Sequence, residues 1–285
     1  MQFWRCKFLL LAALLFVPAY GEAAITEVSA NRETCTPGAN VDSLVCTFNN
    51  NVTSGNKIAA GGAVWDAGNP ASIAATSTCS AALTVYLSSA DTAFGGQFRR
   101  FIAEASATST GGCAITINPS TGSGSFIAYG IDEFACPSGC VLDVDGGQST
   151  GTGTAPSEGL TVGTNSLVLA VMGYFNTPDT TIAPDGTYTQ IGEEETNATT
   201  ASYNFQFKVA SGAETAAWTL GASNDWRAVS IALKESGGST CGYLVTNVAT
   251  DQLVTETGDA FTSELGACDE FPLPFKGGRG KMRGR

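Results

Sequence analysis

Carboxylates and aromatic rings are the side chains through which this chain could act on or bind another molecule, because its 285 residues contain no histidine. Catalysis by a Ser-His-Asp or Cys-His arrangement is thereby excluded. A glycoside hydrolase needs only two carboxyl groups, and Asp132-Glu133 is the most suggestive acidic pair. Neighbouring residues of a strand point to opposite faces, so only one of them can face a given cleft, and Glu104 or Asp143 would have to partner Glu133. We therefore expect no catalytic residues, with a secreted polysaccharide-acting enzyme as the less favoured alternative.

Asp143 and Asp145 form a candidate calcium site. The segment Asp143-Val-Asp-Gly-Gly147 offers two carboxylates in a glycine-rich turn, and oxygen ligands suit this hard cation. The segment lacks the third acidic position and the final Glu of an EF-hand loop. Calcium is thus a candidate cofactor and not a requirement. The acidic run at 193–195 is more typical of a solvated loop.

Aromatic residues at the ends of expected strands are the candidate ligand-binding residues. Flat rings bury the apolar faces of sugars, and Trp65, Tyr174 and Phe175 lie next to expected loops. Trp218 and Trp226 fall within expected strands, a position more typical of core residues. The sequence therefore predicts sugar contact at Trp65, Tyr174 and Phe175.

Residues 1–23 have the features of a secretory signal peptide. Arg5 and Lys7 precede an unbroken apolar run from 8 to 17, and Pro18 ends it. The run is shorter than the roughly 20 residues that a membrane-spanning helix needs. We expect cleavage after Ala23 and a mature protein that is secreted or associated with the cell surface, without membrane insertion.

The cysteines of the mature chain agree with export. Their count is even, which in an exported protein favours disulfides. The sequence leaves the connectivity open, and we prefer sequential pairing, in which each bond closes a local loop. A four-thiolate zinc site is not indicated, because paired C-x-x-C motifs are missing. The residues are Cys35, Cys46, Cys79, Cys113, Cys136, Cys140, Cys241 and Cys268.

Charge is unevenly distributed along the chain. Residues 24–275 contain 25 acidic and 7 basic side chains, whereas the last ten residues contain five basic ones and no acid. Such an acidic body repels nucleic acid and anionic lipid. The basic segment 271–285 is interpreted as a solvated end.

Strand candidates follow from alternation and from enrichment in β-branched and aromatic residues. The clearest is 202–209, where Tyr203, Phe205, Phe207 and Val209 alternate with polar residues. The polar stretch 146–159 is expected to be a long crossover within one sandwich. The other candidates are 58–65, 82–87, 98–105, 113–117, 125–134, 167–174, 187–191, 216–220 and 228–233.

This pattern predicts an all-β protein. We expect an antiparallel β-sandwich of jelly-roll or concanavalin-like type over 24–236, a small disulfide-stapled extension over 237–270 and the basic tail. The segment 24–30, just after the expected cleavage point, is predicted to be an ordinary first strand. Donation of this segment to another copy is the alternative.

Four segments resemble a jelly-roll-like sandwich domain of bacterial secreted proteins and some phage virion proteins. They are Val52–Trp65, Phe126–Phe134, Pro184–Ile191 and, as the best match, Ala217–Lys234 with its two tryptophans and closing Ala-Leu-Lys. The resemblance covers about two thirds of the chain. It implies the fold and a role in adhesion, glycan contact or particle structure. The eight cysteines and the segment 240–285 depart from the usual pattern.

Taken together, these features predict a non-catalytic extracellular binding or structural module. The expected partner is an extracellular glycan or a cell-surface component, reached through loop-borne contacts. The alternative is a self-assembling subunit of a filament, coat or virion, whose partner is another copy of the chain.

Overall fold

The computed structural model describes residues 24–35, 38–66, 72–93, 96–119, 124–174, 181–194, 202–236, 245–247 and 252–254. Within these ranges the chain forms antiparallel strands and one short 3-10 helix, η1 (Ser29–Asn31), and contains no α-helix. The prediction of an all-β antiparallel sandwich is therefore confirmed. The jelly-roll connectivity stays a prediction.

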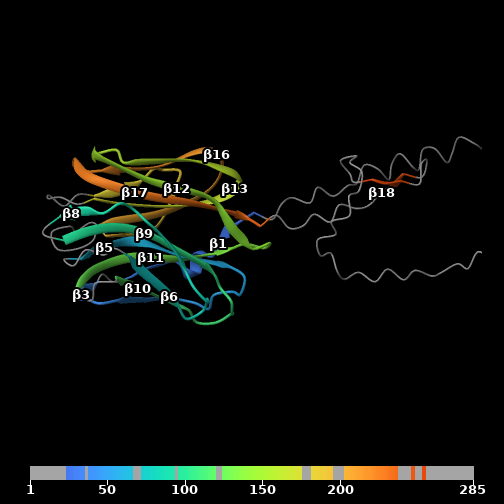
Figure 1. The fold of residues 1–285 in the computed structure, drawn as a ribbon, viewed down its shortest axis with the longest axis horizontal. Coiled ribbons are helices and arrows are strands. Elements are labelled where there is room, and N and C mark those ends of the chain that lie inside the picture. The colour runs from blue at the N-terminus through green and yellow to red at the C-terminus, as the bar shows by residue number, and fades with distance from the viewer. Residues whose placement is uncertain are drawn as a thin grey trace, which may run out of the picture. The chain divides into compact units, whose positions relative to one another are not determined.

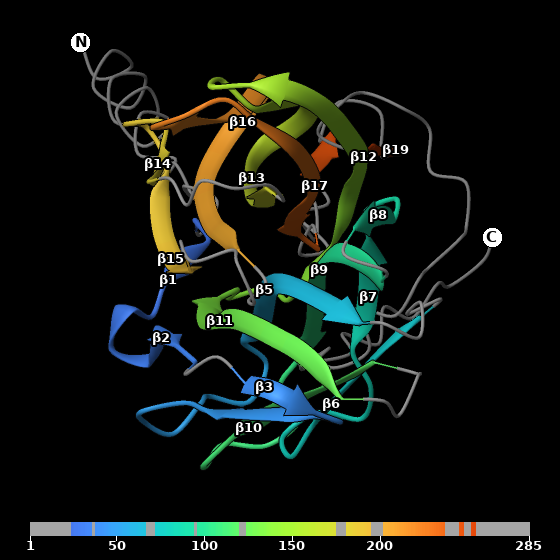
Figure 2. The same ribbon diagram turned by 90° about the vertical axis from the view of Figure 1, so that its left-hand side faces the viewer.

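A central sheet runs through the middle of the first compact unit, which lies within residues 1–236 (Figures 1 and 2). Its strands are β1 (Thr26–Glu27), β2 (Glu33–Thr34), β3 (Gly38–Val41), β5 (Lys57–Asp66), β7 (Thr84–Leu87), β8 (Asp91–Ala93), β9 (Gly96–Ser106) and β11 (Ser125–Ala135). The main order is β1-β11-β5-β9-β7. The short strands β2 and β3 also pair with β11, and β8 pairs with β9.

Strands β5 and β11 are buried on both faces, which explains their nearly continuous small and apolar sequences. Alternate residues of β5 serve two different cores: Ile58 and Ala60 lie in one, Ala59 and Ala63 in the other. Gly62 is required where the strands approach closely, because a Cβ atom there would lie 2.1 Å from the carbonyl oxygen of Ala128. A sheet covered on both faces makes the sandwich three layers deep.

A small sheet covers one face of the central sheet. It consists of β4 (Leu44–Thr47), β6 (Ile73–Ser77) and β10 (Ala114–Pro119), with β10 in the middle. Ile115 and Ile117 of β10 are fully buried and pack with Ile58, Phe101 and other residues of the central sheet. Figure 2 shows this layer below β5 and β11.

A larger sheet, here called the folded sheet, covers the opposite face. Its strands are β12 (Cys140–Gly153), β13 (Ser157–Tyr174), β14 (Ile182–Pro184), β15 (Thr189–Glu194), β16 (Tyr203–Leu220) and β17 (Asn224–Glu235). The order is β12-β17-β13-β16-β14, and β15 also pairs with β16. Leu169 and Phe205 belong to the core that it shares with the central sheet. The fully buried Arg100 of β9 also bridges the two sheets, because its Nε donates to the carbonyl oxygen of Gly173 at 2.9 Å.

The folded sheet bends back on itself. The bend encloses the face of the sheet that is turned away from the central sheet, and this enclosed side is here called its inner face. The bend in β13 has a register shift between Val162 and Ser166, with Asn165 at a φ of 53°, and β16 has Gly212 at a φ of 80°. Left-handed residues and extra residues in a strand both produce such corners. Contacts within β16 confirm the fold-back, since Lys208 Nζ lies 2.8 Å from Glu214 Oε1. A third apolar cluster, which includes Leu160, Met172 and Trp218, fills the enclosed space.

The predicted crossover over 146–159 is wrong, because most of this stretch belongs to β12 and to the start of β13. Its residues 147–153 pair with β17, from Gly147 opposite Ser230 to Gly153 opposite Asn224. Gly151 is needed there, because a Cβ atom would lie 2.6 Å from the ring of Trp226. Composition alone suggested a loop, whereas long-range pairing makes a strand.

The first strand lies in the central sheet of its own chain, where Thr26 and Glu27 pair with Ala135 and Phe134. The chain divides into two compact units, 1–236 and 237–285. In the second unit the described residues form one hairpin, β18 (Val245–Asn247) with β19 (Gln252–Val254).

Candidate functional site

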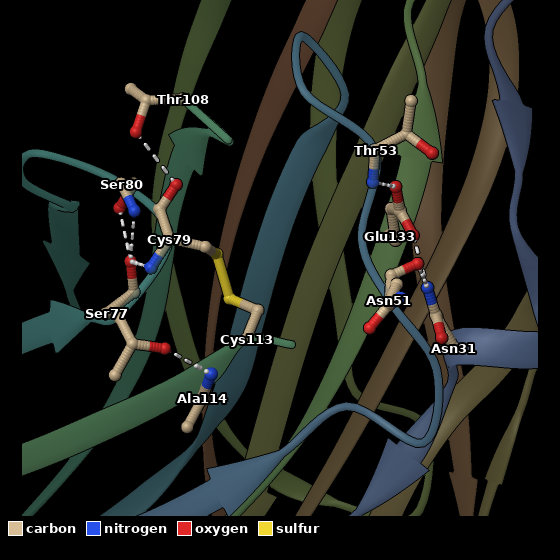
Figure 3. Close-up of a disulfide and its surroundings, with 11 residues drawn as sticks. Asn31, Asn51, Thr53, Ser77, Cys79, Ser80, Thr108, Cys113, Ala114 and Glu133 are labelled. Carbon is tan, nitrogen blue, oxygen red and sulfur yellow. Dashed lines mark hydrogen bonds between the residues drawn. A yellow bond between two sulfur atoms is a disulfide. The ribbon is translucent and has the colours of Figure 1, made fainter. Parts of the chain in front are cut away.

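Asp132 and Glu133 point to opposite faces of the central sheet, as their adjacency in β11 predicted. Glu133 lies on the side of the small sheet and is fully buried. Its Oε1 accepts hydrogen bonds from the backbone N–H of Thr53 at 2.8 Å and from Asn56 Nδ2 at 2.6 Å, and its Oε2 accepts one from Asn31. Figure 3 shows the contacts with Thr53 and Asn31. The carboxylate thus fastens the loop at 51–56 and the N-terminal segment to β11. These contacts are structural.

Asp132 lies on the side of the folded sheet and is also fully buried. Arg32 Nε is 3.4 Å from its Oδ2, and the same guanidinium pairs with Glu27 and lies 5.6 Å from the centroid of the Phe207 ring. Burial and the nearby charge of Glu27 raise the pKa of Asp132 to about 8, against the lowering effect of the Glu133 N–H and of Arg32. A carboxyl group that is protonated near neutrality could act as an acid, but here it serves as an anchor for the N-terminal segment.

The two partners proposed for Glu133 are engaged elsewhere. Glu104 Oε2 forms a buried ion pair with Lys57 Nζ at 2.7 Å, and Asp143 Oδ1 lies 3.0 Å from Lys234 Nζ. Glu104 also lies on the other side of the central sheet from Glu133. It is paired with Ala59, which packs towards the folded sheet, whereas Glu133 lies on the side of the small sheet. The structure therefore brings neither Glu104 nor Asp143 to Glu133.

The calcium candidates Asp143 and Asp145 form hydrogen bonds with different neighbours. Asp143 Oδ2 accepts hydrogen bonds from Gly163 N–H at 2.6 Å and Ser166 Oγ at 2.8 Å. Although burial acts to raise it, the pKa of Asp143 is lowered on balance by these hydrogen bonds and by Lys234. Asp145 instead accepts from the N–H of Gly147 and acts electrostatically on Tyr86 of β7. Within the described ranges, no three His, Cys, Asp or Glu side chains gather as a metal site.

The aromatic candidates have different environments. Trp65 is partly buried at one end of β5, and its ring lies 5.4 Å from that of Phe126 at an angle of 58°. Tyr174 is fully buried in the cluster enclosed by the folded sheet, so its ring face is not open to a sugar. Phe175 lies outside the described residues. Trp218 is a core residue, as predicted, with only 2% of its surface exposed.

Three of the four predicted disulfides are present. Cys35 pairs with Cys46, Cys79 with Cys113 and Cys136 with Cys140, which confirms sequential pairing for these six residues. Cys241 and Cys268 lie outside the described residues. Two of the three bonds hold the small sheet: Cys46 is in β4, and Cys79 and Cys113 join the end of β6 to the start of β10. Figure 3 shows the latter bond with Ser77, Ser80 and Thr108 around it.

The outer side of the small sheet presents a uniform array of short side chains, here called the stapled face. The register places Thr116 of β10 directly between Val45 of β4 and Thr76 of β6. The three strands contain no charged residue, and Val45 is 58% exposed. The stapled face consists of Val45, Thr47, Ala74, Thr76, Ala114, Thr116 and Asn118.

Sequence reasoning missed the stapled face because only one of its strands, 113–117, was predicted. A signal was present in Leu44–Thr47 and Ile73–Ser77, where apolar and small polar residues alternate. These segments are short, and their threonines and alanines are equally frequent in the surrounding loops. Pairing with β10 across the sequence distinguishes them.

No family profile, curated protein or solved structure matches the chain. In the part of the chain that the structure describes, no helix is long and apolar enough to cross a membrane.

Proposed function

We propose that this protein is a non-catalytic binding module that acts outside the cell and contacts a neutral glycan through its stapled face. The observation that carries this proposal is an exposed, uncharged sheet surface that two disulfides hold in place. A chain with 25 acidic and 7 basic residues between 24 and 275 would ordinarily show charge on such a surface. An uncharged exposed face in an acidic protein therefore points to contact with an uncharged partner.

The chemistry of the stapled face suits a polysaccharide. Threonine hydroxyls and the Asn118 amide donate and accept hydrogen bonds as sugar hydroxyls do, while Val45 and the alanines offer apolar contact to C–H groups. Neighbouring strands lie about 4.8 Å apart and alternate residues about 6.7 Å apart, so the face repeats regularly in two directions. A surface held by disulfides has little conformational entropy to lose on binding.

Disulfide chemistry supports the location outside the cell. Bonds such as Cys35–Cys46 and Cys79–Cys113 persist in oxidising compartments and are rare in the cytosol. They agree with the signal peptide expected over 1–23. We accordingly place the mature chain, residues 24–285, in a secreted or surface-associated location.

The buried carboxyl groups support a role without catalysis. Glu133 accepts three hydrogen bonds from the protein itself, Glu104 pairs with Lys57, and Asp143 pairs with Lys234. A glycoside hydrolase requires two carboxyl groups that flank a substrate bond. These groups instead hold the protein's own segments together.

Binding of the purified mature chain to an array of neutral and charged polysaccharides tests the proposal. We expect a neutral glycan to bind, and we expect Thr76→Lys to weaken this binding at least tenfold, because a long charged side chain would then cross the stapled face. Thr161→Lys is the matched control, since Thr161 is an exposed threonine on a strand of the folded sheet. It should bind like the unmodified chain.

Two results would redirect the proposal. Binding that survives Thr76→Lys but is lost in Trp65→Ala would assign the glycan to the strand-end aromatic residue. Release of new reducing ends from any glycan would favour the enzyme alternative, and Glu133→Gln would then be the first variant to assay.

Self-assembly is the second candidate function, and the edges of the small sheet favour it. Strands β4 and β6 each pair with β10 on one side, and neither carries a charge or a proline that would discourage strand addition. Another copy could extend the sheet there. Sedimentation of the mature chain measures this directly: ordered multimers that Ala75→Pro disperses would favour a filament or coat subunit over a monomeric binder.

A further inference from the structure

The inner face of the folded sheet contains buried polar atoms with no hydrogen-bond partner among the described residues. They are Glu158 Oε2, Gln206 Oε1, Ser230 Oγ and both amide atoms of Asn224. All four side chains are at most 3% exposed. They lie among the apolar residues that the bend of this sheet encloses, so they are shielded from bulk solvent. These unpaired atoms therefore suggest that the inner face of the folded sheet binds a ligand.

Strand pairing places two of these side chains on either side of one residue, and a hydrogen bond places the third beside the next row. Ala170 of β13 lies directly between Ser230 of β17 and Gln206 of β16. In the adjacent row, Ser149 of β12 pairs with Ala228 of β17 and hydrogen-bonds to Glu158. Glu158 thus reaches back from the far arm of the bend to the row beside Ser230 and Gln206.

Asn224 does not belong to this group. It lies six residues along β17 from Ser230, which corresponds to about 20 Å in an extended strand. Its partner in the sheet is Gly153, at the opposite end of β12. The shared location is therefore limited to Glu158, Gln206 and Ser230.

Two of the three groups use one polar atom for a hydrogen bond and leave an oxygen without a partner. Gln206 Nε2 donates to the carbonyl oxygen of Ala217 at 3.3 Å, which leaves its Oε1 unpaired. Glu158 uses one carboxylate oxygen for Ser149 and leaves Oε2 unpaired. Each buried polar atom without a partner costs about 1–3 kcal/mol, and native proteins rarely retain several close together. A positively charged guest with oxygen affinity would satisfy all three atoms and compensate the carboxylate.

We propose that the bend of the folded sheet binds a hard cation, with Glu158 Oε2, Gln206 Oε1 and Ser230 Oγ as its protein ligands and water completing its coordination. Carboxylate, amide and hydroxyl oxygens are the ligands that calcium and similar cations prefer. One carboxylate gives a weak site, on the order of 10⁻⁴ to 10⁻³ M, the range used by extracellular modules. This site is distinct from the one predicted at Asp143 and Asp145, because Asp143 has donors on both oxygens.

Burial supports the need for a cation at Glu158. Desolvation raises the pKa of Glu158, against the lowering effect of the Ser149 hydrogen bond. Two lysines of this sheet, Lys208 and Lys234, form ion pairs with other carboxylates. Lys208 pairs with Glu214, and Lys234 pairs with Asp143. Neither lysine is paired with Glu158.

Urea unfolding of the EDTA-treated mature chain, followed by tryptophan fluorescence, tests the proposal, because Trp218 and Trp226 belong to the same enclosed cluster. Titration with CaCl2, with MgCl2, NaCl and KCl in parallel, should raise the unfolding midpoint. At ten times the dissociation constant of the effective cation, the unfolding equilibrium constant should fall about elevenfold. Glu158→Gln should abolish this response, and Asp143→Asn should retain it.

Ser230→Ala is a second variant for the case in which Glu158→Gln does not fold. It removes one ligand with a change of a single atom, and the concentration of cation needed for half of the effect should rise several-fold. The proposal is overturned if no cation shifts the midpoint, if Glu158→Gln responds like the unmodified chain, or if only Asp143→Asn loses the response.

Discussion

The small sheet and the folded sheet cover opposite faces of the same central sheet but are held there by different means. The small sheet has three short strands and two disulfides, Cys35–Cys46 and Cys79–Cys113. The folded sheet has long strands and docks through packing and the buried Arg100–Gly173 contact. The disulfide Cys136–Cys140 lies near this sheet but closes only the link between β11 and β12.

The difference reflects how much apolar surface each sheet can bury. Strands of four to six residues present few inward side chains, and small units of this kind depend on disulfides for stability. Strands of up to 18 residues bury enough to hold themselves, with apolar side chains left to fill the space under their bend. Covalent stapling thus stabilises a thin layer whose outer side is uncharged, and packing stabilises a thick layer with polar groups inside.

The largest expected effect comes from the noncovalent docking of the folded sheet. Phe205→Ala should lower the free energy of unfolding by about 3–5 kcal/mol, because the ring fills the space that Gly61 leaves open. A Cβ atom at Gly61 would lie 2.5 Å from this ring. Urea unfolding measures the loss. Val45→Ala on the stapled face should change stability by less than about 0.5 kcal/mol, and equal effects at the two positions would contradict this account of the docking.

A smaller and more local effect should follow from removing a staple. The double variant Cys79→Ser with Cys113→Ser should lose about 2–4 kcal/mol, because the bond closes a loop with a sequence separation of 34 residues. Hydrogen exchange should accelerate at the amides of β6 and β10 and remain slow in β13 and β16. Faster exchange throughout both sheets would show that the staple serves the whole protein and not the small sheet.

The last expected effect is a dependence of stability on pH that arises at Asp132. Its pKa is raised to about 8 in the folded protein and is about 3.9 in an unfolded chain. The folded state therefore binds the proton more tightly, and this group's contribution to stability is complete below about pH 4 and is lost as the pH rises towards 8. Asp132→Asn should flatten the dependence between pH 5 and 8 in urea unfolding. An unchanged slope would assign the dependence to other groups.

Alternation of apolar and polar residues was sufficient to predict the strands whose two faces differ. The segment 202–209 is the clearest case, since Phe205 and Phe207 face the central sheet in the structure. The preference for sequential cysteine pairing rested on a different argument, that each bond closes a local loop, and the three observed bonds have sequence separations of 11, 34 and 4.

The features that the sequence did not predict depend on pairing between segments that are distant in the sequence. Residues 146–159 are polar on both sides, so nothing in their composition indicated a strand along β17. Tyr174 is at the end of a strand, yet the bend of the folded sheet covers it. The group of Glu158, Gln206 and Ser230 comes from three strands, and only the register of β13 brings Ser230 and Gln206 to its two sides.

The bend in β16 also bears on the order in which this chain can acquire its structure. Its internal contacts join residues close in sequence, six apart for Lys208 with Glu214 and eleven for Gln206 with Ala217. Arg32 and Asn31, by contrast, find Asp132 and Glu133 about a hundred residues later. Loop closure over short separations costs less entropy and is faster. We therefore expect the corner of the folded sheet to form early and the N-terminal segment, although first to emerge during synthesis, to dock last.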